Sequence, residues 1–115
     1  MTALYGIKNC DKVRAARKWL ENAGIDYEFV DIRETPLTDA GLKDWQQELG
    51  WEALVNKRST TWKGLSAAER DGLSEASSRK LIIAQPTLMK RPVLVTGSGV
   101  HNGFTPASYE AIFKN

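Results

Sequence analysis

Two side chains that carry much of enzyme chemistry are almost absent from this chain: its 115 residues contain one cysteine and one histidine. A single cysteine excludes an internal disulfide. One cysteine and one histidine are also too few ligands for a zinc site. An unpartnered thiol suits a reducing compartment, so we expect a cytoplasmic protein that holds no metal.

Long apolar runs and a large net charge are also missing. No stretch approaches the ~20 apolar residues of a membrane helix, and residues 1–10 lack the features of a signal peptide. Sixteen lysines and arginines against fourteen acidic residues give a charge of +2, too small to predict binding to nucleic acid. The length and the 42% of hydrophobic residues favour one globular domain over residues 1–115, and we expect a monomer.

The first third of the sequence predicts a β-α-β unit. The apolar run Thr2–Gly6 is typical of a strand, and apolar residues recur at helical spacing after Cys10. Gly24 is a typical helix stop. Ile25–Ile32 then predicts a second strand, which would pair in parallel with the first.

The middle of the chain predicts helices and one polar loop. Thr38 is the expected N-cap of a helix that ends at Gly50. The sequence then predicts a short helical turn at residues 51–56 and a polar loop at Lys57–Gly64. Further helices, with Ser66 or Ser74 as N-caps, would continue to Ala84, and Pro86 would end them.

The last quarter predicts a hairpin and a closing helix. Arg91–Phe104 contains two short apolar runs around Gly97-Ser98-Gly99, which is a hairpin signal. Thr105-Pro106 has the order of an N-cap and a first-turn proline, and Tyr109, Ile112 and Phe113 would face the core. The element order βαβ, helices, ββα indicates an α/β domain.

Cys10 stands where the first strand leads into the first helix, so unpaired N–H groups of the helix would favour its thiolate. Lowering a thiol pKa by ~2 units requires ~2.7 kcal/mol, whereas a helix terminus supplies ~0.3–1 and at most ~2 kcal/mol. A cation at ~4 Å could supply ~4 kcal/mol at an effective dielectric of ~20. Asp11 is adjacent and opposes ionisation, so cations are needed.

Four basic residues are candidates for this role. Lys8 and Lys12 are near Cys10 in sequence, while Arg58 and Arg91 would have to reach it through the fold. Arg91 precedes a proline and is therefore held extended. Two arginines that converge on a thiolate would form a pocket for a carboxylate or an oxyanion.

Simpler interpretations remain open at this point. A solitary cysteine is often a small buried apolar residue, and single arginines are often solvated surface residues. His101 is expected to be a solvated turn residue, and Trp62 either packs in the core or lines a site. A phosphatase loop is excluded, because that chemistry needs an arginine where Ala16 stands.

The segments "LYGIKNCDKVRAARKWL", "LGWEALVNKRSTTWKGL" and "KRPVLV…GF" together resemble the small YffB-type branch of the glutaredoxin-coupled arsenate reductase (ArsC) and Spx family. The resemblance implies a thioredoxin-like, glutaredoxin-like βαβ–ββα core with a helical insertion at about residues 37–86. It also implies that Cys10 is the nucleophile, that Arg58 and Arg91 bind the ligand, and that Pro92 is a cis-proline facing the sulfur.

The sequence departs from this family at three positions. Phe104 stands where arsenate reductases of this type usually carry a third arginine, and Gly6 stands where they tend to carry a histidine. Spx-like regulators often have a second cysteine where Val13 stands here. The first departure weakens the case for arsenate, because a multiply charged anion would lose one partner.

These features lead to the hypothesis of a glutathione-dependent thiol reductase related to arsenate reductases. The Cys10 thiolate would attack a disulfide or an oxidised form of a small-molecule or protein thiol substrate, giving a mixed disulfide that external glutathione or glutaredoxin would resolve. Lys8, Lys12, Arg58, Arg91 and Pro92 would form the binding site, without a tightly bound cofactor. The alternatives are a true arsenate reductase and a protein-binding regulator like Spx.

Overall fold

The computed structural model describes residues 2–114, which form two compact units. One unit comprises the chain up to Glu34 together with the part from Arg91 onward, and the other is Thr35–Lys90. The predicted helical insertion, at about residues 37–86, lies inside the second unit, and the expectation of one domain stays a prediction. No helix within residues 2–114 combines the length and the apolar character needed to cross a lipid bilayer.

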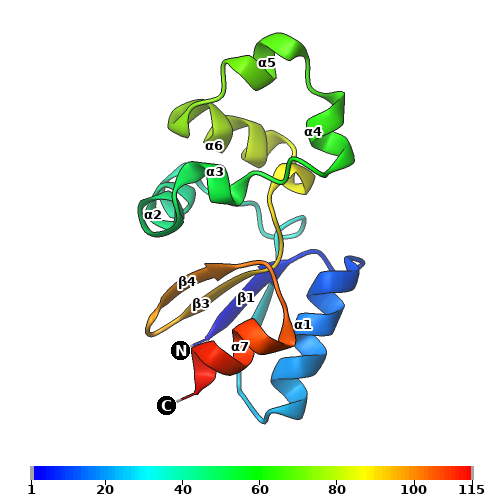
Figure 1. Ribbon diagram of the computed structural model, residues 1–115, viewed down its shortest axis with the longest axis vertical. Helices are drawn as coiled ribbons and strands as arrows, with labels where there is room; N and C mark the ends of the chain where they lie inside the picture. The colour runs from blue at the N-terminus through cyan, green and yellow to red at the C-terminus, as the bar shows by residue number, and fades with distance from the viewer. Residues whose placement is uncertain (1, 115) are drawn as a thin grey trace. The chain divides into compact units, whose positions relative to one another are not determined.

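The first unit is built on a four-stranded sheet (Figure 1). Its strands are β1 (Ala3–Gly6), β2 (Glu28–Asp31), β3 (Val93–Thr96) and β4 (Gly99–Asn102). They lie in the order β2-β1-β3-β4, with β1 parallel to β2 and antiparallel to β3, and β3 antiparallel to β4. This confirms the predicted β-α-β unit and the predicted hairpin.

The second strand is shorter than predicted because its first residues end the preceding helix. Two hydrogen bonds end helix α1 (Asp11–Asn22). The N–H of Ile25 donates to the carbonyl of Leu20 at 3.0 Å, and the N–H of Gly24 donates to the carbonyl of Glu21 at 3.1 Å. Gly24 has φ +71°, the left-handed conformation that this helix ending uses. Ile25 therefore completes the helix ending, and the strand begins at Glu28.

Helices α1 and α7 (Pro106–Phe113) pack on the sheet face that carries Leu4 and Leu94. Tyr109 of α7 is fully buried there, and partly buried aromatic side chains surround it. The ring of Trp19 lies 5.6 Å from that of Tyr109, edge to face. The prediction that Tyr109, Ile112 and Phe113 face the core is confirmed.

The connection after β3 follows the predicted turn, but one residue beyond it was predicted wrongly. His101 was expected to be a solvated turn residue. It lies in β4, where it pairs with Leu94, and its Nε2 atom is buried with no hydrogen-bond partner among residues 2–114. The connection between the strands is only Gly97-Ser98, so pairing begins at Gly99 and continues to Asn102. His101 therefore lies inside the strand and not in the turn.

The second unit is helical in the part of the chain that the structure describes, apart from an isolated bridge between Val55 and Met89. Its elements are α2 (Asp39–Leu49), α3 (Trp51–Leu54), α4 (Thr60–Gly64), α5 (Ala67–Asp71), α6 (Glu75–Ala84) and the 3₁₀ turn η1 (Pro86–Leu88). Thr38 caps α2 as predicted, and both Ser66 and Ser74 are N-caps.

The polar loop predicted at Lys57–Gly64 is wrong in its second half, which forms α4. Ser59 is the N-cap of this short helix, because its Oγ accepts the N–H of Trp62 at 3.0 Å. The Lys63 N–H donates to the carbonyl of the same serine at 3.2 Å. The serine within "KRSTTW" was the signal for a helix start.

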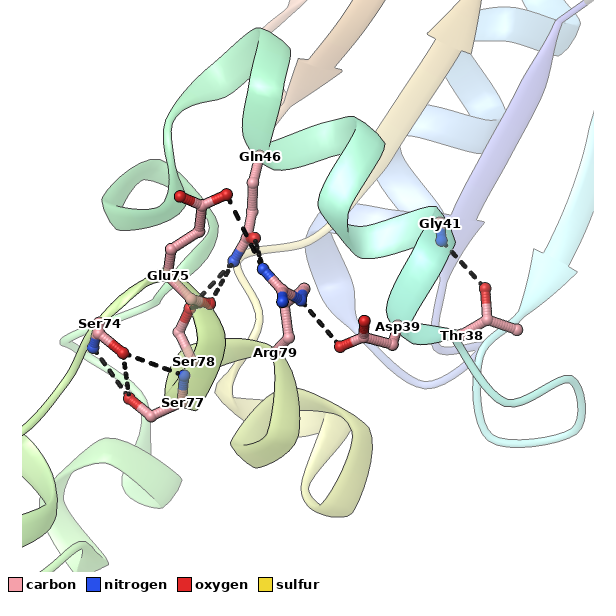
Figure 2. Close-up of polar contacts among 9 residues, drawn as sticks. All are labelled: Thr38, Asp39, Gly41, Gln46, Ser74, Glu75, Ser77, Ser78 and Arg79. Carbon is pink, nitrogen blue, oxygen red and sulfur yellow. Dashed lines mark hydrogen bonds and ion pairs between the residues drawn. The ribbon is translucent and has the colours of Figure 1, made fainter.

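A partly buried polar network joins α2 to α6 (Figure 2). The Nη1 atom of Arg79 donates to Oε1 of the buried Gln46 at 2.9 Å, and Nε donates to the Asp39 carboxylate at 2.8 Å. The Gln46 amide nitrogen donates in turn to Ser78 Oγ at 3.0 Å. The network satisfies polar atoms that the helix pair buries, as such groups require.

We expect Arg79→Ala to lower the free energy of unfolding by about 1–3 kcal/mol, because it leaves the buried Gln46 oxygen without this donor. Lys80→Ala is the matched control, since it removes a charge from an exposed position of the same helix. Urea denaturation followed by circular dichroism measures both. Equal losses for the two variants would contradict the importance assigned to the network.

Gly6, the last residue of β1, lies directly against α1. A Cβ atom at this position would lie 2.6 Å from Cγ2 and 2.9 Å from Cγ1 of Val13. The valine cannot easily give way, because a β-branched side chain in a helix is nearly fixed in one rotamer. The absence of a side chain at Gly6 therefore sets the distance between the strand end and the helix.

We expect Gly6→Ala to destabilise the protein by about 1–3 kcal/mol, the range typical of overpacking. Gly64→Ala is the control, because a methyl group there meets no atom within 4 Å. Unfolding of both variants can be followed by tryptophan fluorescence. If Gly6→Ala were as stable as Gly64→Ala, the close packing described here would be refuted.

Candidate functional site at the start of helix α1

Cys10 is the N-cap residue of α1, as the sequence predicts. The strand β1 ends at Gly6, and the Cys10 N–H donates to the carbonyl of Ile7 at 3.1 Å, which closes a tight turn. The Cys10 carbonyl then accepts the N–H of Arg14 at 2.9 Å as the first bond of the helix. The side chain is a partly exposed free thiol, so it is open to reagents.

The surroundings lower the pKa of the Cys10 thiol. Burial opposes this and would raise the pKa, but the N–H of Val13, the hydrogen bond and charge of the Arg91 guanidinium, and the N–H of Lys12 outweigh it. Both amides belong to the first turn of α1, whose N–H groups have no acceptor within the helix and favour a negative charge at its start. The thiolate is thus favoured by a helix start and by one arginine.

Strand pairing explains why Arg91 reaches this position. Tyr5 of β1 pairs with Val93 of the antiparallel β3, so the start of β3 lies beside the end of β1. The chain that enters β3 therefore passes the turn that leads to Cys10. The peptide bond between Arg91 and the buried Pro92 is cis, as the family resemblance implies.

Two of the basic residues near Cys10 in sequence are held by carboxylates. Lys8 Nζ lies 3.2 Å from Glu34 Oε2, and Arg14 forms an ion pair with Asp11 three residues earlier on α1. Both pairs are exposed to solvent. Sequence reasoning missed them, although the three-residue spacing of the second pair was a usable signal.

Lys12 differs from Lys8 in this respect. It is exposed on the first turn of α1, and no carboxylate of residues 2–114 lies within ion-pair distance of it. Its ammonium group is therefore available to an anionic ligand. Ligand binding by Lys8 and Lys12 stays a prediction.

Arg58 belongs to the second unit, where a structured turn carries it. Its N–H donates to Asn56 Oδ1 at 3.0 Å, and Ser59 Oγ donates to the Asn56 carbonyl at 2.7 Å. The Arg58 side chain is exposed. Nearby, Lys57 Nζ lies 5.6 Å above the ring of Trp62. Ligand binding by Arg58 also stays a prediction.

Two departures from the family pattern have a packing explanation. Val13 occupies the space that a side chain at Gly6 would need, so a histidine cannot stand there without a rearrangement of α1. The ring of Phe104 lies 4.7 Å from that of Tyr109, edge to face, and belongs to the core around it. At both positions, this chain has tight packing where the family pattern has a polar side chain.

Known proteins share both the sequence and the structure of this chain. The model of the ArsC family matches residues 5–112. A structure of the YFFB protein is 38% identical, covers 96% of this chain and 97% of its own, and has a TM-score of 0.91. An arsenate reductase (ArsC) related protein from Brucella melitensis is 43% identical over 99% of this chain and 95% of its own, with a TM-score of 0.79.

A relative with a different role is the global transcriptional regulator Spx 2 of Bacillus anthracis. It is 31% identical over 106 residues, which are 90% of this chain and 80% of that regulator. The family therefore contains arsenate reductase-related proteins and regulators, and the fold is thioredoxin-like. On the match over nearly its whole length and on these likenesses, the chain belongs to the ArsC family.

Proposed function

We propose that this chain is a glutathione-dependent thiol reductase whose nucleophile is Cys10. The observation that carries the proposal is the partly exposed thiol at the start of α1, whose pKa is lowered by helix amides and by the guanidinium of Arg91. A thiolate is the reactive form of cysteine in disulfide chemistry. Membership of a family with arsenate reductase-related proteins supports an oxidoreductase role.

The reaction has two exchange steps. The Cys10 thiolate attacks the glutathione sulfur of a mixed disulfide between glutathione and a substrate thiol. The S–S bond breaks, and the substrate leaves as a thiolate that takes a proton from water. Cys10 is then bonded to glutathione. A second glutathione thiolate attacks that disulfide, which releases oxidised glutathione and restores the Cys10 thiolate.

The external thiol follows from the cysteine count. The chain holds no second cysteine in its 115 residues, so nothing within it can resolve a disulfide on Cys10. Glutathione fits this role because its carboxylates suit a guanidinium, which binds such groups in pairs of hydrogen bonds. In the proposal, Arg91 or Arg58 pairs with these carboxylates, Lys8 and Lys12 add positive charge, and Pro92 shapes the binding edge. Glutaredoxin is the alternative resolving partner.

A true arsenate reductase is the second candidate, and the relatives favour it. Against it stands Phe104, whose ring packs on Tyr109 where the family usually supplies a third arginine. An arsenate dianion would then lose one of its charged partners. A regulator like Spx is the third candidate, but a protein that only binds a partner has no need of a lowered thiol pKa.

The first test measures the rate at which iodoacetamide alkylates Cys10 as a function of pH. Because the thiolate reacts and its pKa is lowered, the rate should reach half its maximum below ~8.5, the value for an unperturbed thiol. Arg91→Ala should move the profile to higher pH and slow alkylation at pH 7 by about three- to tenfold, since a hydrogen bond to a charged group is lost.

Two further variants sharpen this test. Arg91→Lys keeps the charge without the planar donors and should fall between the wild type and Arg91→Ala. Lys90→Ala removes an exposed positive charge one residue away and should leave the profile in place. A wild-type midpoint at or above ~8.5 would favour the regulator, and an unchanged Arg91→Ala profile would remove Arg91 from the site.

The second test compares substrates. The purified chain should reduce the mixed disulfide of glutathione and 2-mercaptoethanol with glutathione as the reductant, and Cys10→Ser should abolish the reaction. Mass spectrometry should detect glutathione on Cys10 when the reaction is quenched. Turnover of arsenate with glutathione and glutaredoxin, at a higher kcat/KM than the mixed disulfide, would replace this proposal with the arsenate reductase.

A further inference from the structure

The backbone and the side chain of Lys12 stand in different relations to the reactive thiol. Its N–H is one of the groups that act on the Cys10 sulfur, so the residue begins right beside that atom. Its ammonium group is not one of them, and the side chain is exposed to solvent on the first turn of α1. The charge is therefore carried outward, on a flexible four-carbon stem. A molecule bonded to the partly exposed thiol also extends outward, into the region that this stem can reach.

The other charged side chains around this turn are compensated by close partners. Lys8 Nζ lies 3.2 Å from Glu34 Oε2, and Arg14 pairs with Asp11. The nearby opposite charge in each pair cancels much of the field that an approaching ligand meets. Lys12 has no carboxylate within ion-pair distance in the described chain. It therefore supplies the uncompensated positive charge on the solvent side of the thiol.

We propose that Lys12 is a specificity-determining residue, which makes the Cys10 thiolate select disulfides that carry a negative charge near the attacked sulfur. This inference rests on the proposed function and deepens it, because it names the substrate class of the same thiol. Glutathione mixed disulfides belong to that class through their carboxylates. The two cations then have different tasks: Arg91 acts on the sulfur itself, and Lys12 acts on the part of the substrate beyond it.

Three symmetrical disulfides of nearly equal size separate these tasks. Dithiodipropionate has a carboxylate on each half, bis(hydroxyethyl) disulfide is neutral, and cystamine has an ammonium group on each half. With each reagent the Cys10 thiolate attacks one sulfur, the S–S bond breaks, and the other half leaves as a thiolate that takes a proton from water. Mass spectrometry of quenched samples of the full chain measures how fast the first half appears on Cys10.

The rate with each charged reagent is divided by the rate with the neutral one, so that changes in the thiol itself cancel. In dilute buffer at pH 7, Lys12→Gln should lower the ratio for dithiodipropionate by about two- to threefold, the effect of a unit charge ~6–8 Å away in water. The same variant should raise the ratio for cystamine by a similar factor. Lys12→Arg keeps the charge and should retain both wild-type ratios. In 1 M salt the difference should largely vanish, because the Debye length is then only ~3 Å.

Lys18→Gln is the matched control, since it removes an exposed positive charge from the same helix. At 1.5 Å per residue it lies ~9 Å further along α1 than Lys12, so it should change the ratios clearly less. An equal change in this control would assign the selectivity to net charge and overturn the proposal. Circular dichroism checks that α1 remains folded in every variant, and Lys12→Arg compares two charged side chains if Lys12→Gln is unstable.

Three further results would contradict the role of Lys12. Unchanged ratios in Lys12→Gln would show that its ammonium group does not meet the substrate. Equal slowing with all three reagents would make Lys12 a cation for the sulfur and not for the ligand. Ratios in Lys12→Arg that match those of Lys12→Gln would show that the charge is not the cause.

The inference and the proposed function can fail separately, because the three reagents report a single exchange step that needs neither glutathione nor a physiological substrate. If the chain fails to turn over glutathione mixed disulfides but the ratios respond as stated, the charge selection by Lys12 stands without the reductase. If turnover is found and the ratios do not respond, the reductase stands and Lys12 has no part in its selectivity.

Discussion

The antiparallel pairing of β1 with β3 is the constraint on which the site depends. It joins the first strand to a strand that begins at residue 93, and it brings the start of β3 beside the end of β1. The thiol follows β1 and the arginine precedes β3, so one register brings together two groups that are far apart in the sequence. Helix α1 then adds its amides, because it begins at the thiol. A change of register would separate Arg91 from Cys10.

Local signals in the sequence predicted most of the first unit. The position of Cys10 at a helix start, the helix ending at Gly24 and the turn at Gly97-Ser98 each depend on a few neighbouring residues, and all three are confirmed. The start of β2 was predicted too early, because Ile25 belongs to the helix ending. The spacing of apolar residues cannot distinguish this position from the first residue of a strand. The ladder that joins β1 to β3 also has no local signal, and its arrangement came from the family resemblance.

The position of the Cys10 thiol at a helix start was predictable from the sequence, but the balance of charges around it was not. Arg91 was identified because of its position before a proline and its place in the family pattern, and it does act on the thiol. Lys8 and Lys12 are equally near Cys10 in the sequence, so both were candidates for the site. The structure differs between them, because Lys8 forms an ion pair with Glu34 and Lys12 does not. That difference depends on where the chain after β2 lies, which no local pattern contains.

The lowered pKa of Cys10 results from effects that are each modest. Burial works against ionisation and is the largest single influence, a helix start supplies only ~0.3–1 kcal/mol in ordinary cases, and the remainder must come from Arg91 and the geometry around it. No single contribution in this balance is large enough to overcome burial by itself. The thiolate therefore depends on the strand register that brings Arg91 to the start of α1 as much as on the helix amides.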